Sequence, residues 1–173
     1  MKNKNFTYVL AIILIVIASF SRLIPHQENF SPILGIALLG TAYLPNKWLK
    51  YFVPIAVMFI SDLFLGLHST MLFTYGSLAL IVWVSSIMLK KVNFRTVLNS
   101  SLLASIIFFL VTNFGFWLMS GLYTLDINGL VRCFELAIPF YRNTLTSCLI
   151  STAVLFGIYQ GSLALAQKFV LSK

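Results

Sequence analysis

The chain has 173 residues, of which 60% are apolar and 9% are charged, and its formal net charge is +8 at pH 7. Soluble domains are usually about 45–50% apolar and about 25% charged, so a soluble core could not bury this much apolar surface. The composition therefore excludes an ordinary soluble protein. It predicts an all-α, polytopic membrane protein with a single transmembrane domain over residues 1–173.

Six apolar stretches follow one another along the chain. A helix needs roughly 20 residues to cross a bilayer, with a range of about 17–25. The first stretch begins like a signal peptide, but no A-x-A cleavage site follows it, which favours an uncleaved span. The second is short, and it fits either a span with little tilt or a partly re-entrant segment. The expected spans are about 6–23, 32–45, 48–66, 69–89, 97–119 and 141–166.

The sequence before and within the last span carries two further signals. An external amphipathic helix is expected at 125–138, and Pro139 should separate it from the last span because proline breaks helices. Gly157 and Gly161 form a G-x-x-x-G pattern, which lets another helix approach closely. Packing within the monomer is the favoured interpretation of this pattern, with dimerisation as the alternative.

The lysines fall in four groups, at residues 2–4, 47–50, 90–91 and 168–173, which lie between the apolar stretches. Basic residues scattered in this way are a topology signal, and they argue against a nucleic-acid partner. All four acidic residues and three of the four arginines lie elsewhere. The positive-inside rule then predicts a multi-pass protein of the inner (plasma) membrane with both termini in the cytoplasm.

Polar side chains gather in the segments expected outside the membrane. Asp62 should lie about 6 Å below the end of its span, at 1.5 Å per residue. An acid at that depth tends to face a cavity or a cation, and Arg22 or Arg142 could be the cation. A helix-locking ion pair and a role in a cavity wall are both open. Ser69 or Thr70 could cap the following span.

Two asparagines and several aromatic side chains extend this outer group. Asn113 and Trp117 are one turn apart on the same helix face, and Arg142 with Asn143 should stand at the first turn of the last span. Trp117 also fits an aromatic belt at the membrane interface. A few convergent polar groups among apolar walls are typical of a small-molecule site. The candidate substrate-binding residues are Arg22, His26, Asn29, Asp62, His68, Tyr75, Asn113, Trp117, Arg142 and Asn143.

No catalytic or metal-binding pattern is present in the sequence. The chain has no HExxH, GxSxG or phosphate-binding loop. Cys133 and Cys148 give no metal spacing and are expected to be unpaired thiols. The sequence therefore predicts a protein that is not an enzyme, with no catalytic residue, no metal site and no cofactor.

Four segments carry a resemblance to a family of uncharacterised bacterial membrane proteins. They read RLIPH..NF.P at 22–32, SD...G.HSTM...Y at 61–75, TNFG.W at 112–117 and AIPF.RNT at 137–144. More distantly, the chain is similar to the substrate-binding S components of energy-coupling-factor (ECF) vitamin transporters. That similarity implies a compact bundle of six helices with a vitamin or trace nutrient bound near the outer face.

One departure from the S components concerns their partner. S components dock their coupling subunit through alanines four residues apart on the first helix. Here Ala11 is followed by Ile15 at that spacing, and Ala18 by Arg22. Whether an energy-coupling module is a partner of this chain therefore stays open.

Two hypotheses of function follow from these observations. In the leading one, the protein binds and takes up a small nutrient such as a vitamin or cofactor precursor. The outer polar residues would orient this substrate, and Tyr75 and Trp117 would stack on it. In the alternative, the chain is a non-transporting structural or accessory membrane protein whose outer polar residues lock helices together. The lipid bilayer is a partner in both.

Overall fold

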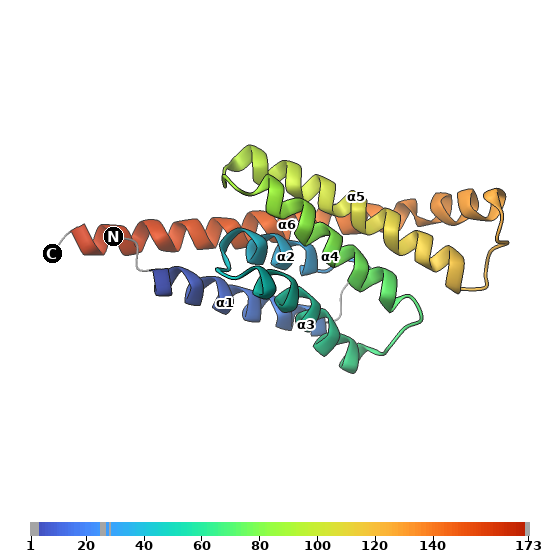
Figure 1. The fold of residues 1–173 in the computed structure, drawn as a ribbon, viewed down its shortest axis with the longest axis horizontal. Helices are drawn as coiled ribbons and strands as arrows, with labels where there is room; N and C mark the ends of the chain where they lie inside the picture. Colours follow the sequence, from blue (N-terminus) through green and yellow to red (C-terminus); the bar gives the residue numbers. More distant parts are fainter. Residues whose placement is uncertain (1–3, 25–26, 28, 172–173) are drawn as a thin grey trace.

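A computed structural model of the chain describes residues 4–24, 27 and 29–171, which form an all-helical bundle (Figure 1). Within these residues five helices are long and apolar enough to cross a membrane, and α2 is shorter. The prediction of an all-α protein is confirmed for the described residues, and five of its helices are suited to cross a membrane. The elements are α1 (Lys4–Phe20), the short 3-10 helix η1 (Ser21–Leu23), α2 (Ile33–Tyr43), α3 (Lys47–Leu65), α4 (Met71–Met88), α5 (Phe94–Met119) and α6 (Ile127–Leu171).

Each long helix buries one stripe and leaves its other faces apolar. On α3 the buried residues are Pro54, Met58, Ser61 and Asp62, which recur at the three- and four-residue spacing of one helix face. Large side chains such as Phe52 and Phe64 are exposed on the same helix. A bilayer accepts such faces, because lipid tails are as apolar as the side chains that meet them.

The short helix α2 is the centre of the bundle. Its residues Ile33–Thr41 are all buried, and a helix that is apolar all round is one surrounded by protein. Its 11 residues span about 16 Å, which is roughly half the hydrocarbon thickness of a bilayer. Gly35 lets α2 approach α6 closely, since a Cβ atom there would lie 2.5 Å from the Ser151 Oγ.

Helix α6 runs unbroken through Pro139, so the predicted break at this residue is wrong. The helix has 45 residues and includes Pro139 in its interior. Proline removes one backbone hydrogen bond, but neighbouring helices can hold such a helix together in a membrane. Here the Phe109 ring of α5 packs against Phe134 before the proline, at 5.6 Å between centroids, and against Tyr141 after it, at 4.8 Å.

The G-x-x-x-G pattern of α6 faces outward, so the expected packing within the monomer is also wrong. Both Gly157 and Gly161 are exposed. Among the described residues, no atom of another element lies within 4 Å of the Cβ position at either glycine. Close helix approach therefore occurs at Gly35, while the outer face of α6 stays open.

The two ends of the bundle differ in chemistry. Figure 1 shows the N- and C-terminal ends of the chain on the same side, where the α2–α3 and α4–α5 connections also lie. Lys90 and Lys91 lie in the α4–α5 connection, and Lys47 and Lys50 lie in the first turn of α3, so we call this side the lysine end. The opposite side, called the polar end, holds η1, residues 66–70 and residues 120–126. These lysines, which are separated from the acidic residues along the sequence, thus lie together at one end of the bundle.

Substitution of Gly35 tests the packing of α2. We expect Gly35→Ala to destabilise the protein by about 1–3 kcal/mol, because the added methyl group overpacks the contact with α6. Gly76→Ala is the matched control: nothing lies within 4 Å of its Cβ position on α4, so we expect no loss and a gain of up to about 1 kcal/mol. Thermal unfolding in detergent measures both, and equal effects would contradict the packing.

Candidate functional site

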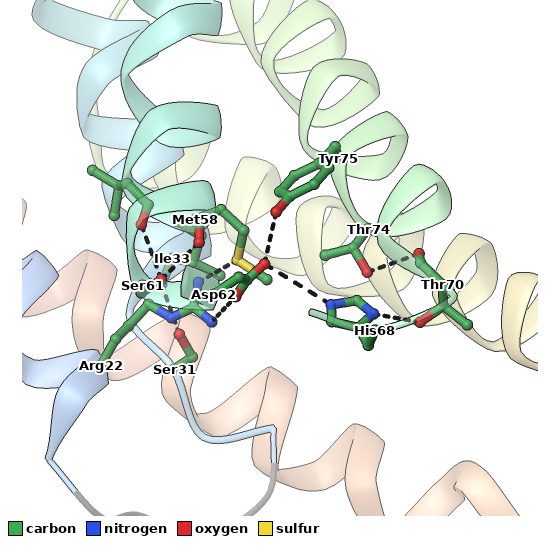
Figure 2. Close-up of polar contacts among 11 residues, drawn as sticks. Arg22, Ser31, Ile33, Met58, Ser61, Asp62, His68, Thr70, Thr74 and Tyr75 are labelled. Carbon is green, nitrogen blue, oxygen red and sulfur yellow. Dashed lines mark hydrogen bonds and ion pairs between the residues drawn. The ribbon is translucent and has the colours of Figure 1, made fainter. Parts of the chain in front are cut away.

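Asp62 is the centre of a buried polar network at the polar end (Figure 2). Its side chain lies 3.3 Å from Arg22, measured from Oδ1 to Nη2, and Oδ2 accepts a hydrogen bond of 2.8 Å from the Tyr75 hydroxyl. Arg22 is only 7% exposed and Asp62 only 3%. The network therefore joins η1, α3 and α4, and its two charged side chains are buried.

Helix periodicity places both charges inside. Arg22 continues the buried stripe of α1, which includes Ala11 and Ile15. Asp62 follows Met58 by one turn on the buried face of α3. Helix α3 then ends at Gly66, whose φ of 110° suits glycine and whose N–H donates to the Asp62 carbonyl at 2.8 Å. The chain direction changes directly after the acid, which brings α4 and Tyr75 back to it.

Burial of two charges is costly unless they are paired and hydrogen-bonded. Arg22 supplies the pairing, which answers the choice between Arg22 and Arg142. The guanidinium is incompletely satisfied: Nη1 donates to the Met58 thioether, a weak acceptor, and Nε has no acceptor among the described residues. The pair thus ties η1 to α3 while leaving Arg22 with unused donor capacity.

His68 extends this network toward solvent. Its Nδ1 lies 2.8 Å from the Thr70 Oγ1, and its Nε2 lies 3.9 Å from Asp62 Oδ2. Thr70 is the N-cap of α4, but its side chain makes no capping bond, so the predicted side-chain cap is not formed. Within the described part of the chain, no three His, Cys, Asp or Glu side chains are grouped to hold a metal ion.

A cavity of about 390 Å³ opens beside the network, with His68 and Met58 in its wall. None of its lining residues carries a fixed charge. Aromatic rings and short polar side chains share the wall. The lining residues are Asn29, Met58, His68, Thr70, Thr74, Phe108, Thr112, Asn113, Phe116, Tyr123, Cys133, Leu136, Ala137 and Phe140.

Three polar side chains of the wall donate hydrogen bonds within their own helices. The Thr74 hydroxyl donates to the Thr70 carbonyl at 3.3 Å, and the Thr112 hydroxyl donates to the Phe108 carbonyl at 2.7 Å. The Asn113 amide nitrogen donates to the Phe109 carbonyl at 2.7 Å. Since these donors serve their own helices, the side-chain oxygens keep lone pairs that can accept from a solute.

The loop at residues 120–126 closes the polar end over α5 and α6. The Trp117 indole donates to the Thr124 carbonyl at 2.9 Å. Asp126 caps α6 by accepting from the Gly129 N–H at 2.7 Å, and it also accepts from the Thr124 hydroxyl at 2.9 Å. These bonds lower the pKa of Asp126, the Gly129 N–H most. The loop carries Tyr123 into the cavity wall.

The structure brings six of the ten predicted binding residues together. Three of them line the cavity, namely Asn29, His68 and Asn113. The other three, Arg22, Asp62 and Tyr75, form the adjoining network.

The remaining four predicted residues do not line the cavity or are not described. Trp117 holds the outer loop, as shown by its bond to Thr124. Arg142 is exposed in the interior of α6, so its predicted place at the first turn of a span facing Asp62 is wrong, because α6 begins at Ile127. Asn143 is half-buried beside it and lies outside the cavity wall. His26 lies outside the described residues.

Several wall residues were missed from the sequence, although helical spacing could have found them. Thr74 follows Thr70 by one turn, and Phe108 precedes Thr112 by one turn. Cys133 and Ala137 have the same spacing and fall within the helix that was expected at 125–138. Both cysteines are buried free thiols, as expected.

A family model described as "Family of unknown function (DUF6580)" matches residues 2–169. The chain belongs to this family, in agreement with its resemblance to uncharacterised membrane proteins. No curated protein and no solved structure matches the chain.

Loss of both charges of the buried pair should cost less than the sum of the two single losses. We expect Asp62→Asn and Arg22→Met each to destabilise the protein by about 3–5 kcal/mol, because each leaves the other polar group unpaired. The double variant should be destabilised by about 0.5–3 kcal/mol less than the sum of the two single effects. Unfolding of purified protein in mixed micelles measures all three.

Asp126→Asn is the matched control for this cycle. It removes an exposed carboxylate but keeps a side chain that caps helices equally well, so we expect stability to be unchanged. Strictly additive effects of the Arg22 and Asp62 substitutions would show that the two side chains are not energetically coupled.

Proposed function

We propose that this member of the DUF6580 family is a membrane protein that binds and takes up a small nutrient, such as a vitamin or cofactor precursor. The observation that carries the proposal is the cavity of about 390 Å³ at the polar end. Ligand sites in proteins are typically clefts of about 300–1,000 Å³ with mainly apolar walls and a few placed polar groups. The cavity volume lies near the lower end of this range, so the cavity suits a small ligand.

The wall chemistry supports an uncharged, partly planar ligand with hydrogen-bond donors. Rings of Phe108, Phe116 and Phe140 offer faces and edges for a flat apolar body. The oxygens of Thr112 and Asn113 offer acceptors. A charged ligand would find no opposite charge in the wall and would lose its hydration without compensation. The Arg22–Asp62 pair beside the cavity is already internally neutralised.

The orientation in the membrane follows from the positive-inside rule. Lys47, Lys50, Lys90 and Lys91 lie at the lysine end together with the chain termini. We assign this end to the cytoplasm and the polar end to the outside. On this proposal a solute enters the cavity from outside, which is also what the sequence similarity to the S components of ECF vitamin transporters implies.

An energy-coupling module is not part of the proposal. The positions on α1 that would correspond to a docking pair, Ala11 and Ile15, are 0% and 2% exposed. Both side chains are packed inside the bundle and present no surface to a partner. Uptake would have to draw on another source of energy or on a different docking face.

A structural or accessory role is the second candidate, and one observation favours it. Arg22 and Tyr75 both bond to Asp62 and so link η1, α3 and α4, as helix-locking groups would. Trp117 likewise bonds within the chain. This candidate differs from uptake in a measurable way, because it assigns no ligand to the cavity.

Thermal shift with a panel of uncharged heteroaromatic vitamins and their precursors tests the proposal. We expect one class to stabilise the purified protein in a saturable manner. His68→Ala and Asn29→Ala each remove a solvent-accessible polar group from the wall. Each should weaken binding about tenfold, which corresponds to the net value of one hydrogen bond of about 1.4 kcal/mol.

Arg142→Ala is the matched control. Arg142 is exposed and lies outside the cavity wall, so the proposal expects unchanged affinity. If no compound in the panel shifts the unfolding temperature and mass spectrometry finds no small molecule that co-purifies, the structural role replaces uptake.

A further inference from the structure

A second cavity lies at the opposite end of the bundle, between α5 and α6, and has a volume of about 560 Å³. It is a groove with mainly apolar walls, and Asn93 and Gln160 are among its few polar residues. The lining residues are Val92, Asn93, Phe94, Val97, Leu98, Ser101, Leu149, Thr152, Ala153, Phe156, Gly157 and Gln160.

The groove opens onto the outer face of α6 because its residues there are small. Ala153 and Gly157 are exposed, and nothing from another element lies within 4 Å of the Cβ position of Gly157. Along α6 the wall runs from Leu149 to Gln160. At 1.5 Å per residue this is about 16 Å, close to the roughly 15 Å of hydrocarbon in one leaflet.

The mouth of the groove at the lysine end is strongly basic. Lys90, Lys91 and Arg95 are exposed and flank the lining residues Val92–Phe94 in sequence. Asn93 fixes this segment by a reciprocal capping box with Thr96 at the start of α5. Three acidic residues lie in the described part of the chain, and all are away from this mouth. Asp62 and Asp126 lie at the polar end, and Glu135 lies in the part of α6 that starts there.

We propose that this groove binds one acyl chain of an anionic phospholipid, whose headgroup phosphate contacts Lys90, Lys91 and Arg95. Basic residues at the mouth of a groove between membrane helices bind anionic headgroups, and each contributes about 1 kcal/mol near the surface. The groove supplies an apolar slot one leaflet long, and the basic mouth supplies the charge complement.

A second copy of the chain is a less suitable occupant of the same face. A two-fold contact over Gly157 would place three basic side chains near their own copies, and like charges repel. Gln160, which could have served as an interhelical hydrogen-bonding group, already donates to the Tyr43 hydroxyl. The observations therefore favour a lipid.

Native mass spectrometry of the full chain with dioleoylphosphatidylglycerol or dioleoylphosphatidylcholine tests the proposal. We expect the anionic lipid to be retained preferentially. Lys90→Gln, Lys91→Gln and Arg95→Gln should each weaken its retention about fivefold, with little effect on the zwitterionic lipid. Lys47→Gln and Lys50→Gln remove charge from the same end without touching the groove, and they should leave the preference intact.

Gly157→Leu should fill the groove and reduce retention of both lipids. Gly161→Leu adds the same side chain one turn further along α6, outside the groove wall, and should have no effect. Equal retention of the two lipids by the wild-type protein would overturn the proposal. Equal effects of the two leucine substitutions on lipid retention would also overturn it. A dimer that dissociates on either substitution would overturn it too, because this face of α6 would then be a contact between two copies of the chain. None of these results depends on a solute in the cavity at the polar end.

Discussion

The absence of water from the bilayer core governs the whole structure, because every polar group there must find its partner inside the chain. The hydroxyl groups of the bundle show this most simply. Ser61, Thr112 and Ser147 donate to carbonyl groups three or four residues back on their own helices. Asp62 cannot use this solution, since a carboxylate accepts and does not donate. It needs donors from elsewhere, and Arg22 and Tyr75 supply them.

This requirement fixes the arrangement of the polar end. Arg22 can reach Asp62 only if η1 lies against α3. Tyr75 can reach Asp62 only if the chain turns back between Gly66 and the start of α4 at Met71. The cavity then forms where these elements diverge toward α5 and α6. The residue between network and cavity is Met58, which contacts the Arg22 guanidinium and also lines the cavity. A bound solute would therefore sit one side chain away from a buried, incompletely satisfied cation.

The two ends of the bundle divide the chemistry of the protein. The polar end combines a cavity without fixed charge and a neutralised ion pair, which are features suited to the recognition of an uncharged solute. The lysine end combines exposed cations with an apolar groove between α5 and α6. The short helix α2 separates the two ends and packs closely on α6 through Gly35. On the two proposals above, lipid binding and solute binding would occupy opposite ends of one small bundle.

The sequence by itself determined the class of protein, the approximate helices and the separation of basic from acidic segments, because hydropathy and charge are local properties of the chain. It also indicated that Asp62 needs a partner. Only the tertiary structure decided that the partner is Arg22, that α6 continues through Pro139, and that Gly157 faces outward.

The physical reason lies in the solvent. In water an apolar stripe marks the face turned to the core, but in lipid the outward faces are apolar too, as Phe52 and Phe64 are on α3. Hydrophobic periodicity therefore cannot tell the packed face from the lipid face, and helix packing makes that choice. The cavity wall depends on the same choice, since its residues come from four helices and three connecting segments that meet only in the folded bundle.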